Sequence, residues 1–358
     1  MFINQKDSTI IAKVMCAIIF LTFTFAYIYL YQTPTLTYEQ HVLSGGKTVY
    51  HPLISAIVIT VTGYIIHMVT LSITRLRGIV HALNYLPAML FVGVLTSGSP
   101  DASRTEIVWG MSFWVTLILL IIFCIIAKPL KQLTDLLSSH NKMLFSRTML
   151  LNLLTMIVQI FIVCNMGNGD EIFHREITAE VNLKNLDYAA LAKDGDNSER
   201  TDSTLTLLRA IGLDHRGVIA DSLFCQPVTG GVASFLFQKN VHPCLFEPRF
   251  MSRKKTTDYR LCALLAERDL DKFAEMLSGK CDVAKPSAAD SLPKAYREAL
   301  IIYQHQRSTP LTAFTDSLLE LDYRDMRQLM ALCKTTAELN EQLRQNYRNT
   351  YWYYFYKK

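Results

Sequence analysis

The sequence predicts an all-α protein in two parts: a bundle of five transmembrane helices, followed by a soluble domain of paired helices. Three observations lead to this class. Half of the 358 residues are hydrophobic and 19% are charged, which is an apolar balance for a soluble protein of this size. The apolar excess is concentrated in residues 10–166, as long runs between short polar breaks. The remainder has helical periodicity and almost nothing that reads as a strand.

Five runs without a charged residue are candidate membrane spans. Each has about the 20 residues that a helix needs to cross the hydrocarbon core of a bilayer. They cover residues 14–31, 52–73, 78–98, 107–127 and 148–165. The alternative, five long uncharged helices packed side by side in one soluble domain, is disfavoured. The first run is interpreted as a retained span, because AYIYLYQTP follows it in place of the small residues of a signal-peptide cleavage site.

The charges between the runs predict how the chain crosses the membrane. With the N-terminus inside, the inside segments hold eight Lys and Arg residues, and the outside loops hold two, Lys47 and Arg104. This is a positive-inside bias. We therefore expect a multi-pass protein of the bacterial inner membrane, with the N-terminus in the cytoplasm and the C-terminal domain in the periplasm. The lipid bilayer is its first expected partner.

We expect two domains, a transmembrane domain at 1–166 and an extracytoplasmic helical domain at 167–358. Residues 166–358 contain 26 Lys and Arg residues and 26 Asp and Glu residues, so this part of the chain is neutral. Nucleic-acid binding relies on a concentrated basic face. Nucleic acid is therefore not an expected partner.

Short breaks divide the second domain into pairs of helices. They fall at 184–186 before Asp187, at Arg268-Asp269 and at Leu321-Asp322, each between runs with helical apolar spacing. Two helices joined by a very short turn form an αα-hairpin, the unit of helical solenoids. The spacing has no strict repeat period, so a tetratricopeptide-like array and a single bundle are both left open. Residues 226–255 contain Gly-Gly and three prolines, and we expect them to form an irregular segment.

Polar side chains inside the runs are candidate functional groups, because they are costly in lipid and usually face protein or water. His67 lies in the second run, and His81 and Asn84 lie one turn apart in the third. Asn152 and Gln159 mark one face of the fifth. One hypothesis is a path for a proton or a ligand through the two histidines and Asn84. The other, which we favour, is interhelical hydrogen bonding, since the histidines lie near span ends and no run contains an acidic residue.

The candidate chemistry is sparse, which disfavours an enzyme, and we expect no catalytic residue, no cofactor and no metal ion. P-loop, dinucleotide-binding and G-x-S-x-G patterns are not present in the sequence. The acidic segment at Asp194 and Asp196 has Leu205 where a calcium loop has a glutamate. His242 and Cys244 have no second pair of ligands at a zinc spacing.

Cysteine usage permits one disulfide hypothesis. The second domain holds five of the eight cysteines, and a periplasmic location allows disulfides to form. The one pairing that we infer is Cys225 with Cys244, which would close a loop around the irregular segment.

The chain ends on six consecutive aromatic residues and two lysines. We expect this tail to be the last helix of the domain, packed on the preceding hairpins. The alternatives are an interfacial segment on the membrane surface, where Tyr and Trp are favoured, and a docking segment for a partner. The six residues are Tyr351, Trp352, Tyr353, Tyr354, Phe355 and Tyr356.

Four stretches carry a resemblance to a known family. They are YEQHVLSGGKTVYHPLI in the first outer loop, FHREITAEVNLKNLDYAALAK after the last run, LPKAYREALIIYQ at 292–304, and the closing YRNTYWYYFY. Together they resemble a family of uncharacterised bacterial multi-pass membrane proteins, a domain of unknown function. The resemblance implies N-terminal spans, often more than five, that carry a helical, tetratricopeptide-like tail. It implies no catalytic residues.

These expectations combine into a hypothesis about function. The protein is expected to be a non-catalytic scaffold or adaptor of the inner membrane, whose periplasmic helical domain binds protein partners, because helical arrays often serve as binding surfaces. The alternative is a transporter or a component of a membrane enzyme. In that case His67, His81 and Asn84 would line a polar path through the transmembrane helices.

Overall fold

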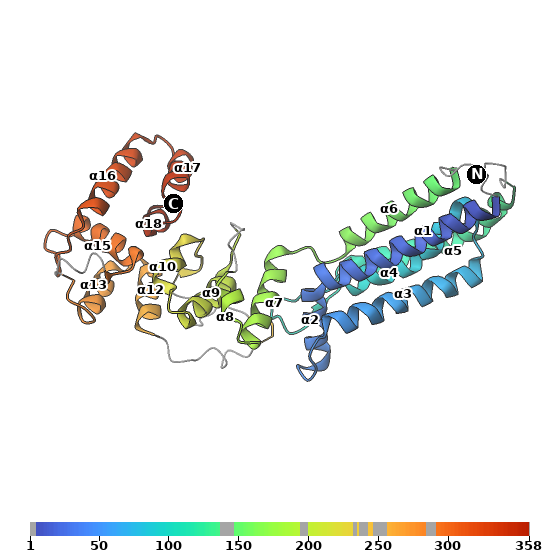
Figure 1. The fold of residues 1–358 in the computed structure, drawn as a ribbon, viewed down its shortest axis with the longest axis horizontal. Coiled ribbons are helices and arrows are strands. Elements are labelled where there is room, and N and C mark those ends of the chain that lie inside the picture. The colour runs from blue at the N-terminus through green and yellow to red at the C-terminus, as the bar shows by residue number, and fades with distance from the viewer. Residues whose placement is uncertain are drawn as a thin grey trace. The chain divides into compact units, whose positions relative to one another are not determined.

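The computed structural model divides the chain into two compact units, Met1–Ile177 and Thr178–Lys358. Almost all regular structure in the described part of the chain is helical (Figure 1), so the predicted all-α class is confirmed. The residues that the structure describes are 5–136, 147–193, 200–231, 235, 243–245, 256–283 and 291–357.

The N-terminal unit consists of long helices joined by short connections. Its elements are α1 (Gln5–Ala26), the π-helical turn η1 (Tyr27–Tyr31), α2 (Thr33–Ser44), α3 (Pro52–Thr74), the 3₁₀-helix η2 (Gly78–Tyr85), α4 (Leu86–Leu95), β1 (Ser99–Pro100), β2 (Ile107–Val108), α5 (Ser112–Leu136), α6 (Arg147–Met166) and the start of α7 (Glu171–Lys184). Five helical segments are long and apolar enough to cross a membrane, in agreement with the five predicted runs. They are Ile10–Tyr31, Pro52–Thr74, Gly78–Leu95, Ser112–Gln132 and Arg147–Met166.

The connections between these helices differ from the sequence prediction in two places. The fourth span is predicted to begin at Ile107, but Ile107 and Val108 form a strand that pairs antiparallel with Ser99–Pro100. The helix α5 therefore begins at Ser112. The first outer loop, for which no element was predicted, contains α2, which has a proline in its first turn and ends at Gly45 in the left-handed conformation. Both are common helix-terminal signals.

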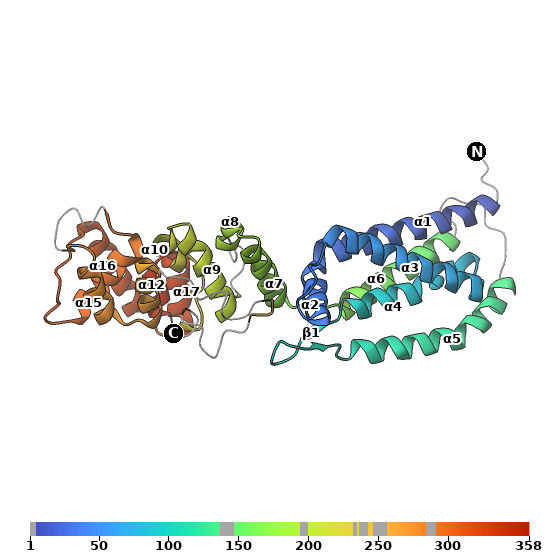
Figure 2. The ribbon, with the colours of Figure 1, turned by 90° about the horizontal axis from the view of Figure 1, so that it is seen from below.

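The segment formed by η2 and α4 is the most buried of the five. Half of its apolar window is buried inside the unit, whereas 11% of the α5 window is buried. α4 packs against α3, α5 and α6, and α1 packs against α3 and α6, as Figures 1 and 2 show. The core between these helices includes Phe20, Tyr85, Met89, Met156 and Val163. The outward faces carry exposed Ile, Leu and Val side chains.

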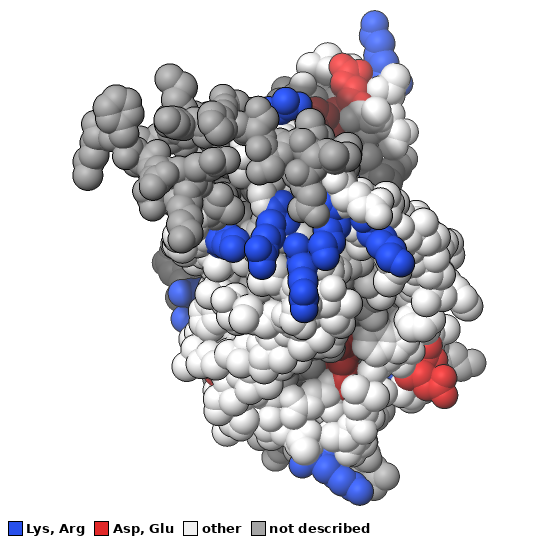
Figure 3. Space-filling model, turned by 90° about the vertical axis from the view of Figure 1, so that its right-hand side faces the viewer, with Lys and Arg blue, Asp and Glu red and all other residues white. Residues whose placement is uncertain are grey.

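One end of this helical bundle is basic. Lys and Arg side chains gather there in the space-filling view of Figure 3. The helix termini at this end carry Arg75 at the C-cap of α3, Arg77 at the N-cap of η2 and Arg147 at the start of α6. Lys128 and Lys131 lie in the C-terminal half of α5. Among the residues that the structure describes, these five belong to the basic set on which the predicted orientation depends.

The C-terminal unit is a series of shorter helices. After the second half of α7 it contains α8 (Tyr188–Ala192), α9 (Ser203–His215), α10 (Ile219–Ser222), the 3₁₀-turn η3 (Leu223–Cys225), α12 (Thr257–Glu267), α13 (Leu270–Ser278), α15 (Lys294–Gln306), α16 (Ser317–Leu332), α17 (Thr336–Tyr347) and α18 (Tyr351–Tyr356). Consecutive helices contact one another at α8–α9, α12–α13, α15–α16 and α16–α17. This arrangement is compatible with both an array of hairpins and a single bundle.

Two of the three predicted helix breaks are confirmed, and each depends on an aspartate cap. The Asp187 carboxylate accepts the Ala190 N–H at 2.9 Å, and the Asp269 carboxylate accepts the Lys272 N–H at 3.1 Å. Such caps satisfy main-chain donors that have no partner inside the helix. The third predicted break, at Leu321-Asp322, is wrong, because α16 is continuous and begins after the cap Asp316.

Several sequence predictions concern residues outside the described ranges. Most of the predicted irregular segment 226–255 lies there, as do Asp194, Asp196 and His242. Within that segment the structure describes residues 226–231, 235 and 243–245. Gly230 and Gly231 both have positive φ angles, which agrees with a turn at this point.

Candidate functional site

The structure brings His67, His81 and Asn84 together in the N-terminal unit. The two imidazole rings lie 6.0 Å apart between centroids, and the ring of His67 stacks on Tyr85 at 3.6 Å. All three side chains are almost completely buried. The cluster therefore consists of polar groups packed among aromatic rings, between α3 and η2.

Asn84 joins the end of α3 to η2. Its amide nitrogen donates to the carbonyl oxygen of Leu76 at 3.0 Å and to that of His81 at 2.8 Å. Its amide oxygen accepts the hydroxyl of Thr74 at 2.6 Å. Asn84 thus satisfies polar groups where the chain reverses direction, which matters because unpaired main-chain groups are costly in an apolar environment.

His67 differs from Asn84 in one respect. Its Nδ1 atom is buried and has no hydrogen-bond partner among the described residues. A buried imidazole nitrogen without a partner loses the hydrogen bond that water would supply. This atom is the single polar group of the predicted cluster that the surrounding side chains leave unsatisfied.

Asn152 and Gln159 of α6 both bond to the main chain of η2. Asn152 Oδ1 accepts the Ala82 N–H at 2.7 Å, and its Nδ2 donates to the Gly78 carbonyl at 2.8 Å. Gln159 Nε2 donates to the Ala82 carbonyl at 3.0 Å. A 3₁₀-helix leaves main-chain groups with poor internal geometry, and these amides pair with them. Their contacts are interhelical, in agreement with the interpretation that the sequence favoured.

A second polar cluster, which no sequence pattern predicted, lies at the other end of the N-terminal unit. The amide of Gln32 donates to the Tyr27 hydroxyl and to the Asn168 carbonyl, both at 3.0 Å. The hydroxyl of Thr35 donates to Gln32 Oε1 at 2.8 Å and lies 3.1 Å from His174 Nε2. These bonds tie the start of α2 to the segment that follows α6.

Glu39 of α2 is a buried acidic residue of this region, and it is 3% exposed. A hydrogen bond from the main chain of Gly98 reaches its carboxyl group, whereas its Oε1 atom has no hydrogen-bond partner among the described residues. Burial raises the pKa of Glu39 to about 8, because a charged carboxylate is disfavoured away from water. The carboxyl group is therefore largely protonated at neutral pH.

In the C-terminal unit, the aromatic tail forms the short helix α18 and packs against earlier helices. Tyr351 and Trp352 are 0% and 1% exposed. The Tyr351 hydroxyl donates to the Leu265 carbonyl at 2.9 Å, and the Tyr354 hydroxyl donates to the Ala266 carbonyl at 2.6 Å. The remaining aromatic residues of the tail are half-buried. This placement agrees with the expected last helix more closely than with a freely projecting docking segment.

Glu298 of α15 holds the start of this helix. Its carboxylate accepts the Tyr351 N–H at 2.6 Å, and its carbonyl accepts the indole N–H of Trp352 at 3.0 Å. Burial raises the pKa of Glu298 to about 7, although the Tyr351 hydrogen bond and Lys294 oppose the rise. A sequence signal for this residue exists, because Ala295, Glu298 and Ala299 share one helix face with buried neighbours. A glutamate on an apolar face is expected to have a specific partner.

The predicted disulfide between Cys225 and Cys244 is not formed in the structure, where all eight cysteines are thiols. The Cys225 thiol donates to the Asp221 carbonyl within its own turn at 3.3 Å. The Cys244 N–H donates to Glu180 of α7 at 2.8 Å. The two cysteines therefore form hydrogen bonds with different elements. The disulfide stays a prediction for the oxidised protein.

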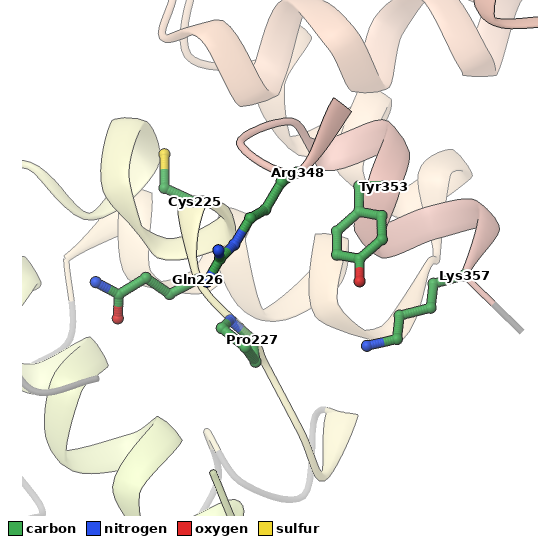
Figure 4. Close-up of a pocket in the computed structure, with 6 residues that line it drawn as sticks. All are labelled: Cys225, Gln226, Pro227, Arg348, Tyr353 and Lys357. Carbon is green, nitrogen blue, oxygen red and sulfur yellow. The ribbon is translucent and has the colours of Figure 1, made fainter. Parts of the chain in front are cut away.

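A small cavity of about 80 Å³ lies beside Cys225 (Figure 4). In Figure 4, Arg348 and Lys357 extend toward Pro227 from the C-terminal residues. The ammonium group of Lys357 also lies 5.3 Å from the centre of the Tyr353 ring. The volume admits only a few atoms. The lining residues are Cys225, Gln226, Pro227, Arg348, Tyr353 and Lys357.

A larger groove of about 540 Å³ lies between α15, α16, α17 and α18. Its apolar wall includes Leu319, Leu329 and Trp352, and its rim carries Asp322 and Asp325. The other lining residues are Lys294, Glu298, Asn346, Tyr347 and Thr350. The volume is within the range of pockets that bind ligands or peptide side chains, roughly 300–1,000 Å³.

The comparisons with known proteins concern the C-terminal unit. No curated protein and no solved structure matches the chain. Residues 250–358 match the model of a family of unknown function, DUF6057. The match includes α12 to α18, and therefore both the aromatic helix and the groove of about 540 Å³. It agrees with the predicted resemblance in that the chain contains a domain of unknown function. The C-terminal part of the chain is thus similar to a family whose function is unknown.

Proposed function

We propose that the protein is a membrane-anchored adaptor. Its N-terminal unit anchors it in the bacterial inner membrane, and its C-terminal unit binds a partner protein in the periplasm. The observation that carries this proposal is the exposure of large apolar side chains on one helix of the C-terminal unit. Leu318, Leu321 and Leu332 of α16 are 78%, 56% and 76% exposed. Exposed apolar surface of this kind marks interaction sites in soluble domains.

The packing of α16 supports the proposal. Of its sixteen residues, Tyr323 and Met326 are the two that are buried. The helix is therefore attached to the unit along a narrow strip, and most of its surface faces solvent. A helix that is stabilised mainly by packing gains from a partner that covers its exposed apolar face.

The N-terminal unit supports the role of an anchor. Asn84, Asn152 and Gln159 bond to main-chain groups just after α3 and within η2, which gives these polar residues a structural task inside the bundle. The basic residues gather at one end of the unit, and positive charge favours the cytoplasmic side of a membrane. The chain after α6 would then emerge on the opposite side.

The second candidate function is a transporter or a component of a membrane enzyme. One observation favours it, namely the buried Nδ1 atom of His67 that has no described partner. Polar groups of this kind inside a membrane frequently belong to a substrate or proton path. In this candidate His67, His81 and Asn84 bind the transported species or move its proton.

The test compares two variants with the wild type in the native cell. One variant ends after Lys184, so that it keeps the N-terminal unit and all of α7. The other replaces both histidines, His67→Ala and His81→Ala. Each tagged protein is purified in mild detergent, co-purifying proteins are identified by mass spectrometry, and each variant is tested for complementation of a deletion strain.

An adaptor predicts a stoichiometric partner that the truncated chain loses and the histidine variant retains, together with complementation by the histidine variant. A transport path predicts that the histidine variant fails to complement the deletion strain, although it keeps any partner that the wild type binds. Failure to recover a stoichiometric partner with the wild type, combined with loss of complementation by the histidine variant, would replace the adaptor proposal by the second candidate.

A further inference from the structure

We infer that the groove beside α16 binds an amphipathic, basic helix of a partner protein. The inference rests on the proposed adaptor function and deepens it, since it names the binding surface and the chemistry of the occupant. The observation behind it is a row of leucine and aspartate side chains on α16, here called the stripe, that lies next to the open groove.

The stripe follows the periodicity of a helix-packing seam. Leu318, Asp322, Asp325, Leu329 and Leu332 are spaced by four, three, four and three residues along α16. This is the spacing that keeps side chains on one face over two heptads. The stripe is about 21 Å long at 1.5 Å per residue. A partner helix of about the same length would match it.

The stripe lies beside the groove and not on the packed face of α16. Asp322, Asp325 and Leu329 belong to the groove lining, whereas the buried residues Tyr323 and Met326 lie on the face that contacts the unit. Leu318 and Leu332, at the two ends of the stripe, are mostly exposed. The groove and the stripe thus form one continuous surface with apolar ends and an acidic middle.

The charges on this surface select a basic occupant. Neither Asp322 nor Asp325 forms an ion pair or hydrogen bond with the residues that the structure describes. The cation in the groove, Lys294, already lies 3.6 Å from the carboxylate of Glu298. The unpaired charges of the groove are therefore both negative. Lys or Arg side chains on the partner would complement them.

The same charges argue against two other occupants. A bilayer surface containing anionic lipids repels aspartates, so the stripe is poorly suited to rest on the membrane. A second copy that presented the same stripe would place its aspartates against Asp322 and Asp325, and such like-charge contacts disfavour association. A separate protein with a leucine-rich, lysine- or arginine-bearing helix fits the observations better. This is the helix-in-groove mode of recognition.

The test uses the full-length protein in nanodiscs of phosphatidylcholine, and empty nanodiscs measure binding to lipid alone. The probe is a fluorescein-labelled helical peptide with leucines on one face and lysines beside them. A matched peptide carries glutamate in place of each lysine. Binding is measured by fluorescence anisotropy at moderate and at high salt.

Two variants alter the surface, and a third is their matched control. L318A/L332A removes apolar area at the ends of the stripe, and D322N/D325N removes its charges without changing side-chain size. The control, L311A/E267Q, changes a leucine that is 73% exposed and an exposed glutamate, both outside the groove. All the substituted side chains are exposed, so folding should be little affected.

We expect the lysine peptide to bind the wild type and the control equally. L318A/L332A should weaken binding about tenfold or more, because an alanine buries less apolar area against the peptide than a leucine does. D322N/D325N should weaken it about threefold, with the difference shrinking at high salt. The glutamate peptide should bind at least tenfold more weakly than the lysine peptide.

Three outcomes would overturn the inference: absence of binding to the wild type, equal binding to all variants, or equal binding of the two peptides. A photo-reactive amino acid at Leu332 gives a second readout, and crosslinks between two copies of the chain would assign the surface to self-association. If a partner co-purifies with L318A/L332A and D322N/D325N as it does with the wild type, this inference fails while the adaptor proposal stands. If the surface binds the peptide but the native cell yields no partner, the adaptor proposal fails alone.

Discussion

Two buried glutamates show how single residues connect the elements of each unit. Glu39 receives a main-chain hydrogen bond from Gly98, and Glu298 receives one from Tyr351 at 2.6 Å. Burial raises the pKa of both carboxyl groups, to about 8 for Glu39 and about 7 for Glu298. The charge of each carboxyl group therefore changes near neutral pH, and the stability of the surrounding packing depends on that charge.

The pH dependence of α18 tests the role of Glu298. The folded pKa of about 7 lies above the ordinary value of 4.5, so the folded state binds the proton more tightly than the unfolded state. Protonation of Glu298 therefore contributes about 3 kcal/mol to the free energy of unfolding. This contribution is fully present below pH 4.5 and is lost as the pH rises through 7. We expect hydrogen exchange of the α18 amides, corrected for its intrinsic pH dependence, to show this loss in the full-length protein. Glu298→Gln should remove most of it, and equal slopes for both proteins would contradict the assignment.

Gly98 tests the position of Glu39. A Cβ atom at residue 98 would overlap the Glu39 carboxyl group, so Gly98→Ala should lower the stability of the protein in detergent by about 1–3 kcal/mol. Thermal unfolding measures the loss. Gly279→Ala is the control, because its nearest neighbour would lie 3.6 Å from the new methyl group. Combining Gly98→Ala with Glu39→Ala should cost less than the sum of the two single losses, and strict additivity would show that the two residues are not in contact.

At the scale of elements, the third apolar segment depends on α6 for its geometry. It begins as the 3₁₀-helix η2 and becomes α-helical only from Leu86, where Pro87 stands in the first turn. Proline is readily accepted at this position of a helix. The carbonyl and amide groups of η2 then pair with Asn152 and Gln159. Polar residues inside a span thus support an irregular stretch of main chain.

Replacing Asn152 tests this support. Asn152→Ala removes two hydrogen bonds between α6 and η2, and we expect a loss of about 1–2 kcal/mol, since interhelical bonds in membranes contribute roughly 0.6 kcal/mol each and at most about 1.7. The matched control is Asn165→Ala, because the Asn165 amide bonds to Phe161 within α6 and is exposed. Thermal unfolding in the same detergent compares them. Equal losses in both variants would mean that the contact with η2 contributes nothing.

At the scale of the whole molecule, the arrangement of charge predicts the orientation of the N-terminal unit. Arg75, Arg77 and Arg147 stand at helix ends, and Lys and Arg side chains gather at one end of the bundle (Figure 3). The connections at the other end contain Gly45 and the β1–β2 hairpin. Because basic residues are retained in the cytoplasm, the second set of connections is expected to face the periplasm.

Reporter fusions test this orientation. Alkaline phosphatase, which is active only after export, should be active when fused after Gly46 or after Lys357, and inactive when fused after Arg77. A fluorescent protein that folds only in the cytoplasm should give the opposite pattern at the same positions. Phosphatase activity after Arg77 combined with its absence after Lys357 would reverse the proposed topology.

Much of the architecture could be predicted because it depends on local signals. Span length and the absence of charge identify apolar helices, and Asp187 and Asp269 mark helix starts by hydrogen bonds within four residues. The predicted break at Leu321-Asp322 was wrong, because an acidic residue also occurs on an exposed face of a continuous helix. The pairing of Ile107 with Pro100 could not be predicted from apolar content alone, since a strand and the start of a helix share that signal.

The candidate sites were predicted less completely. The sequence pointed to His67, His81 and Asn84, which the fold does bring together, because polar residues are conspicuous in apolar runs. It did not point to Glu39 or Glu298, because exposed glutamates are common and burial is a property of the folded chain. The groove beside α16 was also missed. Its walls come from four helices, and no spacing along one segment encodes them.

The sequence by itself determined the all-helical class, the five apolar segments and the gathering of basic residues between them. These properties follow from the hydrophobicity and charge of consecutive residues, which act before any tertiary contact forms. The tertiary structure alone decided which polar groups are buried, that the aromatic tail packs on α12 and α15, and that α16 leaves a leucine and aspartate stripe uncovered. Each of these depends on which distant segments meet, and that is set by packing across the whole unit.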